Sequence, residues 1–174
     1  SSLEDKSCIV FCNHRATIDN LVEFLSEKKM TFAAYHGKLE QEERELSITQ
    51  LRNGSTNILI ATDLAARGLD IPELDCIIHF HIPKYEKEFT HRNGRTARMH
   101  AHGSAIILLK ETDEFSYLDQ NIPTFNLNQK PVTHPEWITM KLPLGRKDKI
   151  NKIDIVGFMY KTIGLNKEEL GIIE

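Results

Sequence analysis

The sequence predicts an α/β fold, a parallel sheet with helices on both of its faces. Two features of the first two thirds of the chain indicate it. Short apolar runs of strand length recur there, and they are nearly continuous, which is typical of strands buried on both sides. Segments with helical periodicity separate these runs, as the crossover connections between parallel strands require.

The first two strands each lead into a helix. Residues 7–12 form a compact apolar run, and Asn13 directly after it is a good N-cap for a helix whose apolar residues recur at helical spacing. A second strand is expected over residues 31–35 and a second helix over residues 39–52. This helix should stop at residues 53–54, Asn and Gly, which favour a C-cap.

Three further strands complete the predicted sheet. They are expected over residues 57–61, 76–80 and 104–109, with a short helix over residues 84–90 before the last of them. A final helix is expected over residues 112–119, capped by its first residue, a threonine. Because ligands of parallel sheets bind at the carboxyl ends of the strands, the polar residues that follow each strand form the candidate site.

The composition indicates a soluble globular protein. With 174 residues, 40% of them hydrophobic and 27% charged, the chain has room for one ordinary domain and part of another. Its apolar runs are too short to span a membrane and its N-terminus lacks a signal-peptide core, so a cytoplasmic protein without membrane contact is expected. The first residue is not Met, which suggests a piece of a longer protein. Cys8, Cys12 and Cys76 are expected to be buried thiols, and no metal site is predicted.

The densest group of cationic side chains is the octet 91–98, His-Arg-Asn-Gly-Arg-Thr-Ala-Arg, in a chain of net charge -3. Arg95 and Arg98 are three residues apart, so on a helix their guanidinium groups would share one face and could close on one phosphate. Taken alone, the octet could equally be a solvated basic turn paired with carboxylates. Residues 62–63 and Gly37 also follow strands directly, so all three groups should line one sheet edge, which favours the phosphate interpretation.

Several motifs in a consistent order resemble those of one family. They are residues 9–13 (IVFCN), residues 35–37 (YHG), Gln41 with Arg44, residues 61–72 (ATDLAARGLDIP) and the octet. Together they resemble the second RecA-like domain of bacterial DEAD-box RNA helicases. The resemblance implies a RecA-like domain over residues 1–125 and, in the parent protein, ATP-driven local unwinding of RNA duplexes.

The resemblance also implies roles at the nucleotide. Arg95 and Arg98 match the arginine fingers that reach the γ-phosphate of ATP. His91 and Arg92 match the pair that couples this domain to its partner across the cleft, and Asp70 matches the residue that contacts the ribose or orders the fingers. ATP and Mg²⁺ would be held mainly by the other RecA-like domain, because the chain contains neither a G-x-x-x-x-G-K-[ST] loop nor an Asp-Glu-Ala-Asp segment.

Five positions match residues that grip the RNA backbone in the family. They are Gly37, Gln41, Arg44, Thr62 and Gly68, of which Gly68 is also expected beside the nucleotide. Such contacts with phosphate and sugar give affinity without sequence preference. Each position also has a simpler explanation: Thr62 could cap a turn, Gln41 and Arg44 could be an exposed helical turn, and Asp70 could pair with an arginine.

The octet and its surroundings depart from the family pattern in two places. Asn93 stands where the family usually has a branched aliphatic residue, so a packing contact is expected to be lost there. Residues 99–103, Met-His-Ala-His-Gly, replace the usual small segment after the last arginine. Ala97, where many members have glycine, is similar to the DbpA branch of the family.

A linker over residues 126–136 and a second module over residues 137–174 are expected to follow. The module has 7 Lys and Arg against 5 Asp and Glu, whereas the preceding residues have 15 against 20. Its expected elements are a strand over 137–142, a basic loop over 145–152, a helix over 154–162 and the start of a strand at 170–173. Residues 155–158 and 164–165 resemble the opening of the DbpA-type RNA-binding domain, an RRM-like fold. The alternative is a basic tail that packs on the first domain.

The predicted function is to supply one part of a two-domain active site. The domain should be a monomer that is inactive alone; with its N-terminal RecA-like partner it would hydrolyse ATP and act on RNA, with ribosomal RNA during ribosome assembly as the target implied by the DbpA-type module. Two alternatives remain. A binding module without catalysis has no chemical need for the arginines, and a dinucleotide-dependent oxidoreductase would need a G-x-G-x-x-G that does not follow the first strand.

Overall fold

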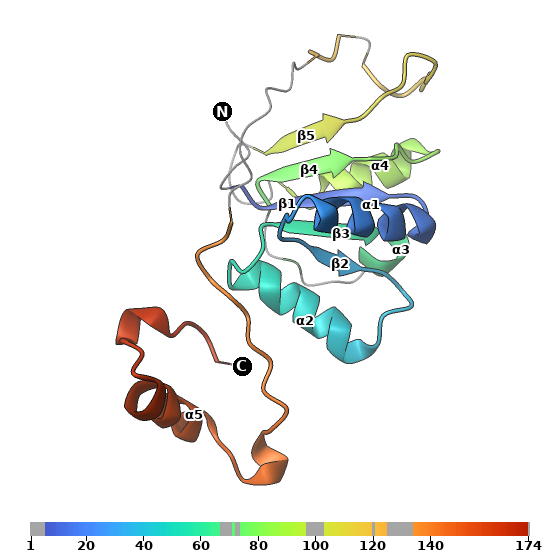
Figure 1. Ribbon diagram of the computed structural model, residues 1–174. Coiled ribbons are helices and arrows are strands. Elements are labelled where there is room, and N and C mark those ends of the chain that lie inside the picture. Colours follow the sequence, from blue (N-terminus) through green and yellow to red (C-terminus); the bar gives the residue numbers. More distant parts are fainter. Residues whose placement is uncertain are drawn as a thin grey trace.

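The protein is built on one parallel sheet. The computed structural model describes residues 6–66, 71, 74–96, 103–119, 121–124 and 134–173. The sheet has five strands in the order β2-β3-β1-β4-β5, and every pairing is parallel (Figure 1). The strands are β1 (Cys8–Cys12), β2 (Ala33–Tyr35), β3 (Ile58–Thr62), β4 (Cys76–His79) and β5 (Ser104–Ile107). The predicted fold class is confirmed.

Helices cover both faces of this sheet and continue into the C-terminal part. Those of the sheet domain are α1 (Arg15–Glu27), α2 (Gln41–Arg52), α3 (Asp63–Ala66) and α4 (Glu86–Asn93). Those of the C-terminal part are α5 (Lys152–Phe158), a π-helix (Met159–Ile163) and two 3₁₀ turns (Arg146–Asp148 and Lys167–Glu169). None of the helices in the described ranges is long and apolar enough to cross a membrane.

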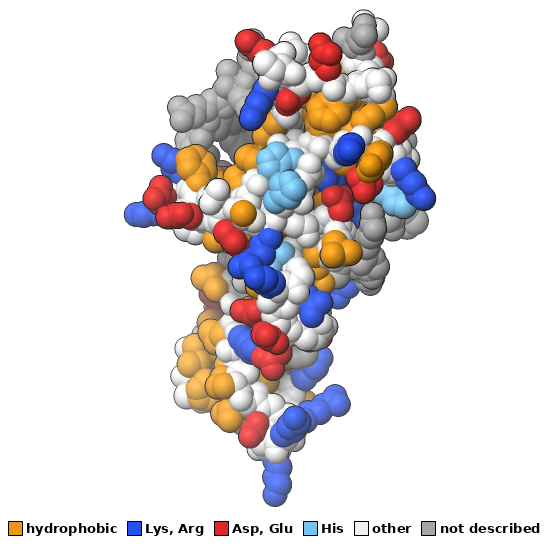
Figure 2. Space-filling view, turned by 90° about the vertical axis from the view of Figure 1, so that its right-hand side faces the viewer, with side chains coloured by type: hydrophobic (Ala, Val, Ile, Leu, Met, Phe, Trp, Pro, Cys, Tyr) orange, Lys and Arg blue, Asp and Glu red, His pale blue; other side chains and the backbone are white. Residues whose placement is uncertain are grey.

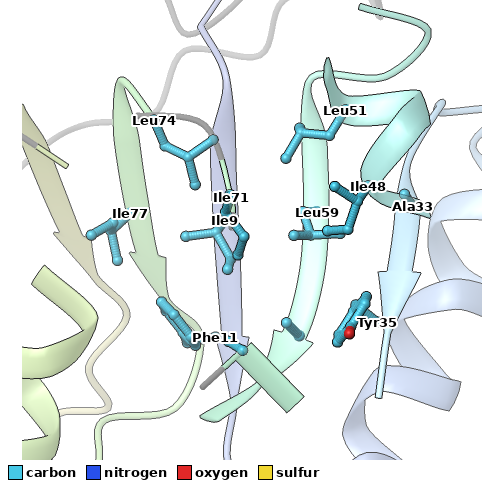
Figure 3. Close-up of a cluster of buried hydrophobic side chains, with 12 residues drawn as sticks. Ile9, Phe11, Ala33, Tyr35, Ile48, Leu51, Leu59, Ile71, Leu74 and Ile77 are labelled. Atoms are coloured by element: carbon cyan, nitrogen blue, oxygen red, sulfur yellow. The ribbon is translucent and has the colours of Figure 1, made fainter. Parts of the chain in front are cut away.

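The core forms two layers, one on each face of the sheet. Ile9 and Leu59 pack in one cluster with Ile48 of α2, and Figure 3 shows Leu59 and Ile48 pointing toward each other. On the opposite face, Ile60 packs with Ile18 of α1. Because successive strand residues point to opposite faces, the neighbours Leu59 and Ile60 serve different layers. This double burial explains why the strands appear in the sequence as continuous apolar runs.

The start of α1 corrects one prediction. The residue that precedes the helix is His14, so Asn13 is not its N-cap. The Asn13 side chain instead donates from Nδ2 to the Ile82 carbonyl at 3.0 Å and accepts from Arg92 at 2.8 Å. A side chain that is committed to these long-range bonds cannot also cap the adjacent helix.

The ends of α2 are built by local chemistry. At its start the Glu43 carboxylate accepts from the Glu40 N–H at 2.9 Å, which satisfies a donor that the helix leaves unpaired. At its end Gly54 has φ +75°, a left-handed conformation that glycine adopts without steric cost. The predicted stop at Asn53 and Gly54 is therefore confirmed. Well-defined ends matter here because Gln41 and Arg44 lie in the first turn of this helix.

Three other predicted elements do not form. Residues 112–119 contain turns and no helix, because Tyr117 packs its ring on Phe89 at 5.6 Å and donates its hydroxyl to the Pro83 carbonyl. These contacts draw the segment onto α4. Residues 137–142 and 170–173 are not strands either; the first of these segments makes side-chain bonds to the end of α2 in place of a strand pairing.

Candidate functional site

Arg92 of α4 is the hub of the sheet's carboxyl edge. Its Nε donates to Asp63 Oδ1 at 2.7 Å and its Nη2 to Asp63 Oδ2, which gives a two-pronged ion pair with the first residue of α3. Nη1 donates to the His81 carbonyl at 2.6 Å, Nη2 also donates to Asn13 Oδ1 at 2.8 Å, and the guanidinium lies 5.0 Å from the Phe11 ring centroid. One buried side chain therefore ties together the segments that follow β1, β3 and β4.

The burial of Arg92 decides what it can do. The residue is only 2% exposed, and Nε, Nη1 and Nη2 all bond within the domain. A buried charge is tolerated when it is paired and hydrogen-bonded, and here all three guanidinium nitrogens have bonds. Neighbouring His91, by contrast, is exposed. Of the two predicted coupling residues, His91 is exposed and Arg92 is buried among its partners.

Arg95 lies just beyond the end of α4. Gly94 ends that helix, with its N–H bonded to the Thr90 carbonyl at 2.9 Å. The Arg95 guanidinium donates from Nη2 to the carbonyl of Ala66, the last residue of α3, at 3.1 Å. Its backbone carbonyl accepts from Leu74 N–H at 3.3 Å, which anchors the residue from the other side. The side chain of the first predicted finger thus lies beside α3.

A pocket of about 310 Å³ lies between α3 and α4. It is lined by Phe11, Asp63, Ala66, Glu88, Thr90, His91, Arg92, Gly94 and Arg95. Since Asp63 already pairs with Arg92, the guanidinium of Arg95 and the exposed His91 are the lining groups best suited to an anion. In the part of the chain that the structure describes, no group of three or more His, Cys, Asp or Glu is placed to hold a metal ion.

Asn93, where the loss of a packing contact was expected, makes a side-chain hydrogen bond that the sequence did not predict. Its Oδ1 lies 2.9 Å from Nε2 of His79, a residue that is 0% exposed and stacks on Phe89 with 4.6 Å between ring centroids. An imidazole that donates from Nε2 leaves Nδ1 as an acceptor, and within the described part of the chain this atom has no hydrogen-bond partner. Burial lowers the pKa of His79 from 6.5 to about 4, although the bond to Asn93 acts in the opposite direction.

This buried histidine predicts acid sensitivity. An unfolded His79 titrates near pH 6.5 and the folded one near 4, so between these values only the unfolded chain takes up the proton. The free energy of unfolding should therefore fall as the pH drops from 7 to 4, by up to about 3 kcal/mol from this group. Urea unfolding at a series of pH values measures it. His79→Phe keeps the stacked ring but cannot titrate, and an equal pH slope in this variant would contradict the assignment.

The predicted RNA-gripping residues lie around β2, α2 and β3. Gly37 is exposed after β2, and space around it is open, since a Cβ built there would meet nothing within 4 Å. Gln41 is exposed and bonds to Glu45 at 2.7 Å, and Thr62 ends β3. Figure 2 views the edge toward which the strands point, and His, Lys and Arg side chains gather in its middle, next to acidic ones.

Two buried nitrogens near this group have no hydrogen-bond partner among the residues that the structure describes. They are Nε of Arg44 and Nδ1 of His36. Buried polar atoms are almost always bonded, so unpaired ones call for water or a ligand. Sequence reasoning placed Arg44 in the site but passed over His36, although it stands inside the Tyr-His-Gly motif that supplied Gly37. Gly68, Asp70 and Arg98 lie outside the described residues.

Comparisons with known proteins agree on one family. Residues 1–100 match the family model described as the helicase conserved C-terminal domain. The ATP-dependent RNA helicase dbp-3 of Neurospora crassa is 35% identical over 96% of this chain and 26% of its own length. For the ATP-dependent RNA helicase DbpA of Escherichia coli the identity is 31% over 98% of this chain and 39% of that protein. The chain thus spans well under half the length of these relatives.

The solved structures extend the agreement to the fold. Domain 2 of the DEAD-box helicase Mss116p, described as bound to an RNA duplex, has a TM-score of 0.53 and 27% identity to this chain. The match covers 60% of this chain and 42% of that one. It therefore supports the fold of part of this chain and does not extend over the whole of it.

Proposed function

The chain belongs to the helicase conserved C-terminal domains, as the second RecA-like domain of a DEAD-box RNA helicase, and we propose that it completes an ATP site which it cannot form alone. In this proposal Arg95 and Arg98 contact the γ-phosphate of an ATP molecule carried by the N-terminal RecA-like domain. The observation that carries it is the position of Arg95, which is anchored on both sides at the sheet's carboxyl edge and borders a pocket. Mg²⁺ would be bound by the partner domain, where it would neutralise phosphate charge.

The chemistry follows from what each arginine can do. Arg92 is committed to Asp63, Asn13 and the His81 carbonyl, so its role is to fix α4. Arg95 donates to the carbonyl of Ala66, and phosphate oxygens would be stronger acceptors than this neutral carbonyl. When the two domains close, its guanidinium would exchange Ala66 for the γ-phosphate and stabilise the charge that develops during hydrolysis.

RNA would bind at the other end of the same sheet edge. In the strand order, β2 and α2 lie on one side of the central β1, and β4 with α4 on the other. RNA held by Gly37, Gln41, Arg44 and Thr62 and ATP held by the arginines would then both favour the same closed arrangement of domains. This linkage would couple ATP hydrolysis to local strand separation.

The proposal extends to the parent protein. Residues 126–136 would be a linker and residues 137–174 an RNA-binding module of the DbpA type, because the similarity to DbpA continues over 98% of the chain. We place the parent in the cytoplasm, acting on ribosomal RNA during ribosome assembly. The module has 7 Lys and Arg against 5 Asp and Glu, and this net positive charge favours an anionic partner such as RNA.

Replacing Arg44 tests the RNA grip directly. Arg44→Ala should weaken binding to an RNA duplex and lower the slope of log affinity against log salt by about one, because one phosphate contact is removed. Arg52→Ala, at the far end of the same helix, should leave the slope nearly unchanged. Fluorescence anisotropy at several salt concentrations measures both variants. Equal slopes for Arg44→Ala and the unmodified chain would count against the contact.

A further inference from the structure

The segment after the linker is attached to α2 by polar side chains. Thr139 Oγ1 accepts from Asn53 Nδ2 at 2.8 Å and donates to Ser55 Oγ at 2.7 Å. Lys141 Nζ donates to Glu42 Oε2 at 2.6 Å, near the opposite end of the helix. Figure 1 shows this segment passing α2 on its way to α5. Because the segment contacts both ends of α2, it runs alongside this helix in a defined direction.

Trp137 adds an aromatic contact to the same attachment. A Cβ built on Gly54, which closes α2, would lie 4.0 Å from its indole, and one built on Gly171 would lie 3.3 Å from it. The indole therefore lies between the end of α2 and the C-terminal segment. We call Trp137, Thr139 and Lys141 the α2 joint. The intervening Ile138 and Met140 are 89% and 68% exposed, so alternate residues point away from the joint, as in an extended chain.

A cationic turn follows the joint along the chain. Arg146, Lys147 and Lys149 stand close together in and after the 3₁₀ turn, and all three are exposed. They follow the joint within a few residues. At the other side of the joint, Glu42, which Lys141 holds, stands in the first turn of α2 together with Gln41 and Arg44. A short connection between two cationic groups gives the second a high effective concentration toward a ligand held by the first.

We propose that the α2 joint makes the turn at Arg146, Lys147 and Lys149 part of one RNA path with Arg44, so that a single RNA strand contacts both. This inference rests on the RNA binding proposed above and adds the requirement that the two contacts be held rigidly. Phosphates are the expected contacts, since the turn presents cationic side chains and no aromatic platform. A short RNA would reach only the α2 end, and a longer one both groups.

The only tryptophan of the chain reports on the joint without RNA. The double variant T139V/K141M removes the polar contacts of both residues while nearly keeping the shapes of the two side chains. Trp137 emission should shift to longer wavelength and acrylamide should quench it more strongly. The matched control is T162V/K161M, which makes the same chemical changes at exposed positions outside the joint. Unchanged emission in T139V/K141M would overturn the joint.

Binding to RNA of two lengths tests the path. For a single strand of about 20 nucleotides the joint variant should lose about tenfold in affinity relative to the control variant, and for one of about 6 nucleotides the two should bind equally. Both variants lose one lysine, so charge alone cannot produce the difference. If the joint and control variants bind both RNAs equally, the single path is overturned while the RNA grip stands. If the unmodified chain binds neither RNA, the proposed RNA binding itself fails.

Discussion

Arg95→Ala in the two-domain parent protein is expected to reduce RNA-stimulated ATP hydrolysis by about 1,000-fold or more, the range found for arginines that stabilise a transferring phosphoryl group. The reason is geometric. The Arg95 backbone carbonyl accepts from Leu74, and the Arg95 guanidinium donates to the carbonyl of Ala66, which ends α3. The residue therefore lies at the edge that a partner domain would meet. Alanine removes every donor from that position. The steady-state rate at saturating RNA and ATP measures the effect.

Two controls separate catalysis from binding and from folding. RNA affinity should be nearly unchanged in Arg95→Ala, because the predicted grip lies at β2 and α2. Arg95→Lys keeps the charge but not the planar fork, so it should recover only a small part of the rate. A turnover number for Arg95→Ala within a factor of three of the unmodified protein would rule out the finger role.

Arg92→Ala is expected to destabilise the domain by about 3–5 kcal/mol, because it leaves Asp63 without its partner and unties the segments after β1 and β4. Urea unfolding measures the loss. Arg15→Ala is the matched control: Arg15 also pairs with an aspartate, Asp19, at 3.5 Å, but these side chains are 43% and 51% exposed. Such a surface pair contributes less than about 0.5 kcal/mol.

Arg92→Lys makes the same test more demanding. Lysine keeps the positive charge but cannot bond to Asp63 at two points while also reaching His81 and Asn13, so it should recover less than half of the lost stability. If Arg92→Ala were no more destabilising than Arg15→Ala, Arg92 would not be the hub of the edge.

The sheet could be predicted because its strands are buried on both faces. Leu59 and Ile60 are both 0% exposed. Because both faces of such a strand are buried, its residues form a continuous apolar run, and the ends of the run predict the ends of the strand. The helix predicted over 112–119 does not form, because Tyr117 packs on Phe89 and donates its hydroxyl to the Pro83 carbonyl. Local pattern contains no information about contacts of that kind.

The candidate site shows the same division. Charge density and position after a strand are local features, and they were enough to place Arg92 and Arg95 at the sheet's edge. The inward role of Arg92 was not predictable, since its partners His81, Asp63 and Asn13 are 11, 29 and 79 residues away along the chain. The contact of Thr139 with Asn53 spans 86 residues and was likewise hidden. The alternative of a basic tail packed on the first domain did foresee a contact of this sort.

The most direct test of the central claim is a structure of the two-domain parent protein with RNA and ADP–BeF₃, an analogue of bound ATP. The account predicts that the Arg95 guanidinium leaves the Ala66 carbonyl and donates to the fluorides at about 3 Å, while Arg92 keeps its bonds to Asp63. A closed structure in which Arg95 still bonds to Ala66 and lies more than about 6 Å from the analogue, well beyond hydrogen-bond reach, would contradict it.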